Sequence, residues 1–453
     1  MNILDDRNIA RLLAAALIVA VGAAGLVFSG VIGDGKRELP DDAFKPAGLA
    51  FEPASFADLE GWRLDDAAET LPVFLRSCAR ILKLPDAAPA NPSEALGPGA
   101  PQGFSLAGAA GDWREACGEA ARVLERPYAD DNARTSAARA FYEYHFRPVR
   151  FFERLEPRPG GPAEGRPPRL SPAGRFTGYF EPFYDATPTR TAEFSAPLYA
   201  RPADLVTVDL GRFRPEFAGE KIAGKVVDGA LDPYPDHAAI NAGALAGRAR
   251  VLAYMRPSDL FFLQIQGSGR IRIAGKEMRV GYDGANGKPY TAIGRTLIAM
   301  GALSKETVSM QTIRAWLDKA SPADARAVRE SNESFIFFRV LDALPDSRLG
   351  PLGAEGVQLT SGRSLAIDPR YAPFGAPVWI NIPGTDENGK DAVRRLVIAQ
   401  DAGGAIKGPL RGDVFVGSGP QAGEVAGAFN ETGGMHVLLP AAVVERLAAA
   451  PRS

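Results

Sequence analysis

Residues 400–416 read QDAGGAIKGPLRGDVFV, and this segment says more about the architecture of the chain than any other. Asp401 ends the apolar run 396–399, and Asp413 opens a short run of strand-forming residues. The loop between them consists mostly of small residues, which let a ligand approach the backbone closely. Short strands linked in this way favour a compact β-barrel over a doubly wound sheet. The two carboxylates at the strand edges therefore form a candidate site.

The two aspartates and a third, Asp368, allow a catalytic and a structural interpretation. Asp413 alternates with Phe415 on one strand face, and an apolar neighbour raises a carboxyl pKa toward the range that a general acid needs. Asp368 precedes a proline, and an aspartate before Gly or Pro is also a routine turn residue. Spacing alone leaves both interpretations open.

Composition excludes several other chemistries. The 453 residues carry 52 Lys+Arg against 54 Asp+Glu, so no basic excess exists for a nucleic-acid partner. The 3 histidines and 2 cysteines lack the spacing of metal ligands, and no nucleophile elbow, dinucleotide fingerprint or P-loop occurs. We therefore expect carboxylate chemistry with no metal and no organic cofactor.

The N-terminus predicts export from the cytoplasm. Residues 12–32 carry no charge, and 1–33 are interpreted as a signal anchor or a signal peptide. The anchor is favoured because no clear cleavage site follows. Residues 34–54 are expected to be a tether. Outside the cytoplasm Cys78 and Cys117 can form a disulfide, although two buried thiols are the alternative.

The remaining sequence predicts a helical region followed by a mainly β region. Residues 55–170 are expected to be mostly helical, with a Pro/Gly-rich insertion near 85–111 and a Pro/Gly-rich linker at 157–172. The predicted helices cover 71–75, with Pro72 in the first turn, and 135–146, 291–300, 305–317 and 420–429, the last ended by Gly433. Strands are predicted at 175–181, 357–359, 378–382, 395–400, 413–416 and 437–439, with a hairpin of 261–266 and 270–273.

Four segments resemble one known family. They are FTGYFEP at 176–182, FFLQIQGSGR at 261–270, NESFIFF at 332–338, and the stretch from 400 through 423. Their order and spacing are similar to those of the lytic murein transglycosylase A family, the membrane-bound lytic transglycosylases of Gram-negative bacteria. The resemblance covers about residues 170–440, and its C-terminal part is similar to a domain named for three aspartates.

The resemblance implies a fold and a reaction. The fold would be a double-psi β-barrel made of 171–200 and 335–440, with a second β domain, 201–334, inserted into it and a groove for a glycan strand. The reaction would cleave the β-1,4 bond between N-acetylmuramic acid and N-acetylglucosamine in peptidoglycan and form a 1,6-anhydro sugar. Asp413 matches the catalytic acid/base and Asp401 the aspartate supporting it, with Asp368 as the third.

Further residues are assigned to substrate binding on the same grounds. They lie in the matching segments and offer hydroxyl, amide or cationic groups, or an accessible backbone: Thr177, Tyr179, Gln264, Gln266, Ser268, Arg270, Gly403, Gly404 and Lys407. Two alternatives stay open. One is a muramidase-type hydrolase in which Asp401 or Asp368 positions water. The other is a glycan-binding envelope protein without catalysis.

The sequence departs from the family in its first part. Family members carry a lipid-modified cysteine after the signal, whereas no cysteine occurs in the first 77 residues here. This favours a periplasmic protein held by an inner-membrane anchor, or a soluble periplasmic form, over an outer-membrane lipoprotein. The expected partners are glycan strands, the membrane through the N-terminal segment, and cell-wall enzymes docking on 55–170.

Overall fold

The computed structural model describes residues 43–91, 105–214, 217, 220–341, 344–384 and 392–449. The predicted anchor at 1–33 lies outside these residues. No helix within the described ranges is long and apolar enough to cross a membrane. The chain divides into two compact units, 1–45 with 157–167 and 46–156 with 168–453. In the smaller unit, 159–166 is a series of turns, in which the Gly161 amide donates to the Arg158 carbonyl at 3.1 Å.

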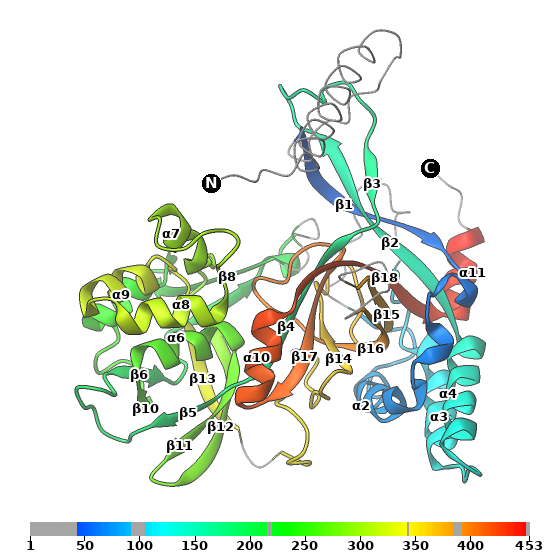
Figure 1. The fold of residues 1–453 in the computed structure, drawn as a ribbon, viewed down its shortest axis with the longest axis horizontal. Helices are drawn as coiled ribbons and strands as arrows, with labels where there is room; N and C mark the ends of the chain where they lie inside the picture. The colour runs from blue at the N-terminus through cyan, green and yellow to red at the C-terminus, as the bar shows by residue number, and fades with distance from the viewer. Residues whose placement is uncertain are drawn as a thin grey trace, which may run out of the picture. The chain divides into compact units, whose positions relative to one another are not determined.

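The largest sheet lies mostly in the second unit and contains a closed ring. Its strand order is β1-β2-β18-β15-β16-β14-β17-β4, and β4 also pairs with β18 (Figure 1). The six strands from β18 to β4 in this order therefore form a closed ring. Within the ring, β14–β16 and β17–β4 are parallel. The bounds are β1 Phe44–Pro53, β2 Phe146–Pro157, β3 Arg169–Ser171, β4 Gly174–Glu181, β14 Ser364–Ala366, β15 Pro377–Ile382, β16 Val393–Asp401, β17 Arg411–Ser418 and β18 Asn430–Pro440. The mainly-β expectation is confirmed. The short strand predicted at 357–359 is reduced to an isolated bridge between Gln358 and Leu352.

The N-terminal part contributes strands as well as helices, which corrects two expectations. β1 occupies 44–53, where a tether was predicted, and β2 extends the large sheet from within the region predicted to be helical. β3, at 169–171, lies in the predicted linker and pairs with β2. Pro46 and Pro53 obscured β1. Proline is tolerated there because β1 lies at the sheet edge, where a missing N–H breaks no ladder bond.

Helices α2 (Leu71–Ile81), α3 (Gly111–Glu125), α4 (Asp131–His145) and α11 (Ala441–Ala449) pack beside the ring (Figure 1). The predicted helices at 71–75 and 135–146 are confirmed, including proline in the first turn of α2. Buried side chains of these helices and of the ring strands form one core, which contains Phe74, Trp113 and Trp379. Cys78 and Cys117 form a disulfide between α2 and α3, so the pairing interpretation is confirmed.

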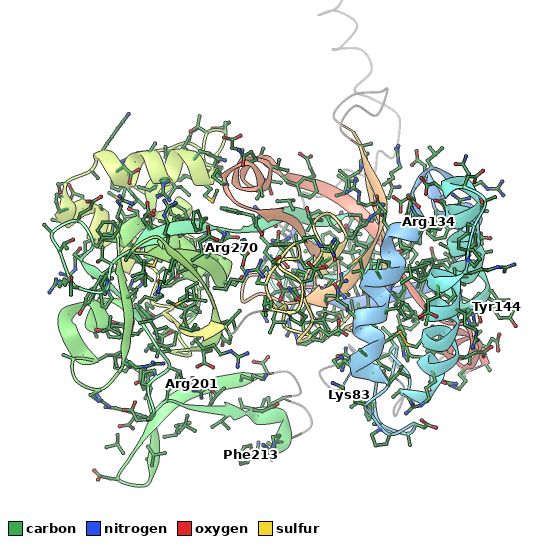
Figure 2. All side chains as sticks on the ribbon, turned by 90° about the horizontal axis from the view of Figure 1, so that it is seen from below. Lys83, Arg134, Tyr144, Arg201, Phe213 and Arg270 are labelled. Atoms are coloured by element: carbon green, nitrogen blue, oxygen red, sulfur yellow. A yellow bond between two sulfur atoms is a disulfide. The ribbon has the colours of Figure 1, made fainter. Side chains whose placement is uncertain are left out.

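The middle of the chain forms three smaller sheets and several helices. The sheets are β13-β12-β11-β5, β10-β6 and β7-β8-β9, and Phe213, between β7 and β8, is 74% exposed (Figure 2). The strands are β5 Phe183–Ala186, β6 Ala196–Tyr199, β7 Val206–Asp209, β8 Lys221–Val227, β9 Ala230–Pro233, β10 Val251–Met255, β11 Ser268–Ile273, β12 Lys276–Ala285 and β13 Ile336–Leu341. The helices are α5 His237–Ala239, α6 Pro257–Gln266, α7 Ile293–Ala299, α8 Met310–Lys319 and α9 Pro322–Glu330. The predicted helix at 291–300 is confirmed as α7, and α8 covers the second half of 305–317.

The predicted hairpin of 261–266 with 270–273 is wrong. Residues 257–266 form α6, which begins with a proline and ends at Gly267 in the left-handed conformation. The true hairpin joins β11 to β12. Alternation failed because α6 is buried on several sides: Leu260 and Leu263 pack in one hydrophobic cluster, and Phe261 and Phe262 pack in another. A helix with no polar face shows no helical period.

Helix α10 (Pro420–Ala428) follows β17 as predicted, but it ends before Gly433. Gly433 lies in β18, where the strand passes close to β15. A Cβ at this position would lie 2.7 Å from the Asn381 carbonyl oxygen, so the glycine serves a close approach of two strands.

Candidate active site

The strand register places Asp401 and Asp413 on either side of one residue. Ala366 of β14 pairs with Asp401 of β16 and with Asp413 of β17. Because neighbouring strands lie about 4.8 Å apart, the two aspartates stand roughly 10 Å apart along the backbone. The two aspartates are separated by 11 residues in the sequence, and their strands, β16 and β17, lie on either side of β14.

Asp413 is held by a side chain of the facing strand. Thr177 of β4 pairs with Asp413 in the parallel β17–β4 ladder, and its hydroxyl donates to Asp413 Oδ1 at 2.6 Å. Arg411 Nη2 donates to the same hydroxyl at 2.8 Å. Since the hydroxyl accepts from Arg411, its own proton is directed at the carboxylate. Thr177 therefore relays the influence of Arg411 to Asp413.

The pKa of Asp413 is raised to about 6. Burial is the main cause, and the nearby negative charge of Asp401 acts in the same direction. The hydrogen bond from Thr177 and the charge of Arg411 oppose the rise. Asp413 nevertheless keeps part of its surface exposed, so a reactant can reach it. A carboxyl with such a pKa can hold a proton in mildly acidic conditions and can also release it, as an acid/base catalyst must.

Asp401 is surrounded by donors. Tyr179 donates to Oδ2 at 2.6 Å, while the amides of Ala354 and Ala402 donate to Oδ1 at 2.7 and 2.9 Å. Burial raises the pKa of Asp401, and these three hydrogen bonds work against that rise. Burial and the charge of Asp401 also raise the pKa of Tyr179 well above its usual value, so its hydroxyl remains a donor.

Asp368 makes a separate contact network. Arg370 binds its carboxylate at two points, 3.0 and 2.7 Å, and the Gly408 amide donates to it at 2.9 Å. Burial alone would raise the pKa of Asp368, but these hydrogen bonds outweigh it and hold the pKa below its ordinary value. Asp368 is 1% exposed. It anchors the end of the loop after Asp401 and makes no hydrogen bond to either carboxylate of the pair.

That loop is open to solvent at several positions. No atom lies within 4 Å of a Cβ built on Gly404, and Lys407 is exposed. A Cβ on Gly403 would lie 2.9 Å from Ile406, so only this glycine is required for packing. These features leave backbone accessible next to Asp401, as the sequence interpretation requires.

Of the residues predicted in the 261–270 segment, Gln266 and Arg270 contact adjacent residues of β4, whereas Gln264 lies apart from them. Gln266 accepts from the Phe180 amide at 3.1 Å, and Arg270 forms an ion pair with the buried Glu181 at 3.0 Å. Ser268 pairs with Gly281 at the start of β11. Gln264 lines a different cavity, which contains neither aspartate. Gln264 and Gln266 lie on α6 and not on a strand, so their side chains point in different directions.

Arg411 and Ala354 were not predicted as site residues. Arg411 stands two positions before Asp413 on one strand, so the period of 2 already places both on one face and could have identified it. The amide of Ala354 reaches Asp401 from a loop distant in sequence. No local pattern in the sequence marks such a contact.

Two protein-family models match parts of the chain. Residues 175–339 match the model of the MltA specific insert domain, and residues 363–439 match that of the 3D domain. A crystal structure of a membrane-bound lytic murein transglycosylase from Agrobacterium tumefaciens is 31% identical, with a TM-score of 0.69 over 88% of this chain and 99% of that one. The chain belongs to the MltA family.

Two comparisons with MltA of Escherichia coli extend this result. Membrane-bound lytic murein transglycosylase A of Escherichia coli K12 is 36% identical over 270 residues, which are 58% of this chain and 65% of that protein. The chain thus matches somewhat less than two thirds of that relative's length. A structure of E. coli MltA with bound chitohexaose is 26% identical, with a TM-score of 0.53 over 91% of this chain and all of that one. Asp368, Asp401 and Asp413 all fall within the 3D domain match.

Proposed function

We propose that the protein is a lytic murein transglycosylase. It would cleave the β-1,4 bond between N-acetylmuramic acid and N-acetylglucosamine in peptidoglycan and leave a 1,6-anhydro-N-acetylmuramic acid end. The observation that carries this proposal is Asp413, a partly exposed carboxyl whose pKa is raised to about 6 next to a second carboxylate. The names of the MltA relatives and the chitohexaose bound to one of them support the same substrate class.

In the proposed reaction Asp413 acts first as an acid and then as a base. Its proton passes to the glycosidic oxygen as the bond from that oxygen to C1 of N-acetylmuramic acid breaks. The C6 hydroxyl of the same sugar then attacks C1, and its proton passes to the Asp413 carboxylate. The atoms balance without water, and the acid is regenerated. An attack within one sugar ring has the entropic advantage of proximity.

Asp401 would act electrostatically and by position. Its negative charge raises the pKa of Asp413 and would favour the positive charge that develops at C1. Its oxygens are already bound by Tyr179 and two backbone amides, which fix the carboxylate in place. We assign Thr177 and Tyr179 as positioning residues, because each acts through one of the two aspartates.

The contacts of the remaining carboxylates favour this reaction over hydrolysis. A hydrolase needs a second carboxylate that activates water or forms a covalent intermediate. Asp368 is bound by Arg370 and Gly408, and Asp401 accepts three hydrogen bonds. Neither is arranged as a free base. A purely glycan-binding protein would have no need for a carboxyl with a raised pKa.

We further propose the finer topology and the location. The closed ring, with parallel pairs β14–β16 and β17–β4, is compatible with a double-psi barrel, the topology that the family resemblance implies. The relatives are named membrane-bound, and residues 12–32 of this chain are uncharged. We infer that the protein acts in the cell envelope, held by this N-terminal segment.

The test is the release of muropeptides from purified sacculi by the full chain in detergent, beside Asp413→Asn. We expect anhydro-ended products from the wild type and none from the variant, while both bind sacculi. Products with reducing N-acetylmuramic acid ends would indicate a hydrolase. Equal binding by two inactive proteins would favour the binding protein.

A further inference from the structure

A cavity of about 420 Å³ lies among β6, β10, α6 and α9, and it contains neither Asp401 nor Asp413. Its lining includes three arginines, Arg190, Arg326 and Arg329, and no aspartate or glutamate. A concave site whose charged side chains are all positive attracts an anion. The catalytic proposal leaves this cavity without a role.

Two of the three arginines form no direct ion pair with a carboxylate of the described residues. Arg326 forms an ion pair with Glu330 at 2.7 Å. Arg190 and Arg329 form no ion pair with any residue in the described part of the chain. Arg329 is also partly buried, and burial lowers the pKa of its guanidinium. The charge of Glu330 opposes this lowering, but Glu330 forms its ion pair with Arg326. The Arg329 guanidinium is thus a ready partner for a further carboxylate, which it can bind at two points.

The same cavity holds an unpaired amide. Gln264 is 8% exposed, and its Nε2 makes no hydrogen bond to the described protein. Leaving a buried polar group unpaired is costly, and native structures keep such groups mainly where a ligand or water completes them. The unpaired amide of Gln264 therefore indicates a site for a polar ligand.

His237 lines the same cavity and adds an acceptor. Its Nδ1 lies 3.1 Å from the Asn332 carbonyl, so Nδ1 is the donor and Nε2 keeps its lone pair. Burial lowers the pKa of His237, and the ring stacks on Phe261 at 6.1 Å. The neutral ring therefore offers an acceptor on an apolar wall of the cavity that Gln264 also lines. Together they suit an amide group.

We propose that this cavity is a second binding site, which takes an amide-bearing carboxylate. The carboxylate would pair with Arg329, and the amide would meet Gln264 and His237. The proposal rests on the proposed function, which makes murein the source of the ligand. Murein carries an amide together with a carboxylate in two places. One is the peptide stem, with its amides and free carboxylates. The other is peptide-free N-acetylmuramic acid, with an acetamido group and a lactyl carboxylate.

Calorimetric titration of the full wild-type chain in detergent tests the proposal with three probes. They are N-acetyl-L-alanyl-D-glutamate for the peptide stem, N-acetylmuramic acid for the sugar, and inorganic phosphate as a simple anion. We expect one of the two organic probes to bind, which also identifies the source. Arg329→Gln should weaken that binding roughly 10- to 100-fold, the effect of losing a charged hydrogen bond.

Gln264→Leu separates a ligand-binding role from a structural one. The variant should weaken binding about 10-fold, while its melting temperature stays the same or rises because an unpaired buried amide is gone. Arg339→Gln, an exposed arginine outside the cavity lining, is the matched control and should bind as the wild type does. If Arg329→Gln fails to fold, Gln264→Leu alone decides.

Three results would overturn the proposal: no binding by the folded protein, equal binding of phosphate, or affinities unchanged in Arg329→Gln and Gln264→Leu. The probes contain no glycosidic bond, so their binding does not depend on turnover. Muropeptide release from sacculi by the same preparation reports separately on the proposed function. A protein that releases anhydro products but binds no probe would contradict only the second site.

Discussion

Asp413 combines a functional advantage with a cost in stability. Its pKa is raised from 3.8 to about 6, so the folded protein binds this proton more tightly than the unfolded chain. The contribution of Asp413 to the free energy of unfolding is therefore most favourable below the unfolded pKa. It is lost as pH rises to about 6 and stays constant above that pH.

Asp413→Asn should consequently be more stable than the wild type at neutral pH. One pKa unit corresponds to about 1.4 kcal/mol, and partial solvent access reduces the effect, so we expect a gain of about 1 to 3 kcal/mol at pH 7.5. The gain should shrink toward zero near pH 4. Urea unfolding at both pH values measures it. A variant less stable at pH 7.5 would assign Asp413 a structural role.

Thr177 sets the pH range of the proposed reaction. The acid step needs protonated Asp413, so the rate should fall as pH rises through about 6. The hydrogen bond from Thr177 lowers the pKa of Asp413, and removing it should raise that pKa. The falling limb of the pH–rate profile of Thr177→Val should therefore move to higher pH. Thr177→Ser, which keeps the hydroxyl, should restore the wild-type profile. A limb that does not move in Thr177→Val would remove Asp413 as the titrating acid.

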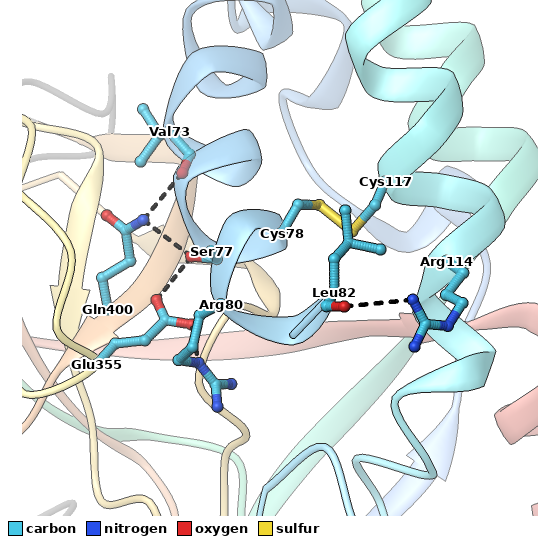
Figure 3. The surroundings of a disulfide bond; sticks show 9 residues. All are labelled: Val73, Ser77, Cys78, Arg80, Leu82, Arg114, Cys117, Glu355 and Gln400. Atoms are coloured by element: carbon cyan, nitrogen blue, oxygen red, sulfur yellow. Dashed lines mark hydrogen bonds and ion pairs between the residues drawn. A yellow bond between two sulfur atoms is a disulfide. The ribbon is translucent and has the colours of Figure 1, made fainter. Parts of the chain in front are cut away.

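At the scale of elements, α2 connects the disulfide to the site. Ser77 donates to Glu355 at 2.6 Å and accepts from Gln400 at 2.9 Å, and Arg80 forms an ion pair with Glu355 at 3.1 Å (Figure 3). Gln400 and Glu355 directly adjoin Asp401 and Ala354, the pair that forms one of the hydrogen bonds of the site. The neighbouring Cys78 of α2 is bonded to α3.

Removing the disulfide should therefore reduce stability. The bridge closes a loop between residues 39 apart, for which chain entropy predicts a loss of roughly 3 to 4 kcal/mol in the variant with Cys78→Ser and Cys117→Ser. Reductant should lower the melting temperature of the wild type and leave that of the double variant unchanged. A wild type that is fully reduced, by thiol titration, yet melts at its original temperature would contradict a stabilising bridge.

Helices with regularly spaced apolar residues could be predicted from sequence, whereas α6, which lacks this spacing, could not. α2 and α10 have apolar residues at helical spacing and a proline in the first turn, and both were found where expected. α6 lies between two hydrophobic clusters, so burial on several sides removed its periodicity and an apparent alternation suggested a strand. Gln264 therefore lies on a helix and lines a cavity that contains neither Asp401 nor Asp413, and its role in substrate binding stays a prediction.

At the scale of the whole molecule, ion pairs between residues distant in sequence could not be predicted. Glu181 at the end of β4 is 1% exposed and forms ion pairs with Arg270 of β11 and Arg279 of β12, both at 3.0 Å. These pairs join the closed ring to the four-stranded sheet. Arg270 was predicted to bind substrate because its segment matched the family, yet its charge is committed to this junction. The aspartate pair was predictable because each aspartate stands at a strand edge, and Thr177 and Tyr179, which donate to it, lie in a segment that matches the family. The Ala354 amide reaches Asp401 from a loop distant in sequence and could not be predicted.

The central claim is that Asp413 promotes cyclisation within one sugar rather than attack by water. Digestion of sacculi by the full chain in H₂¹⁸O, followed by mass spectrometry of the released muropeptides, tests it most directly. We predict anhydro ends that carry no ¹⁸O, because the new bond at C1 comes from the sugar's own C6 oxygen. Products with ¹⁸O at C1 and a reducing end would contradict the account and identify a hydrolase.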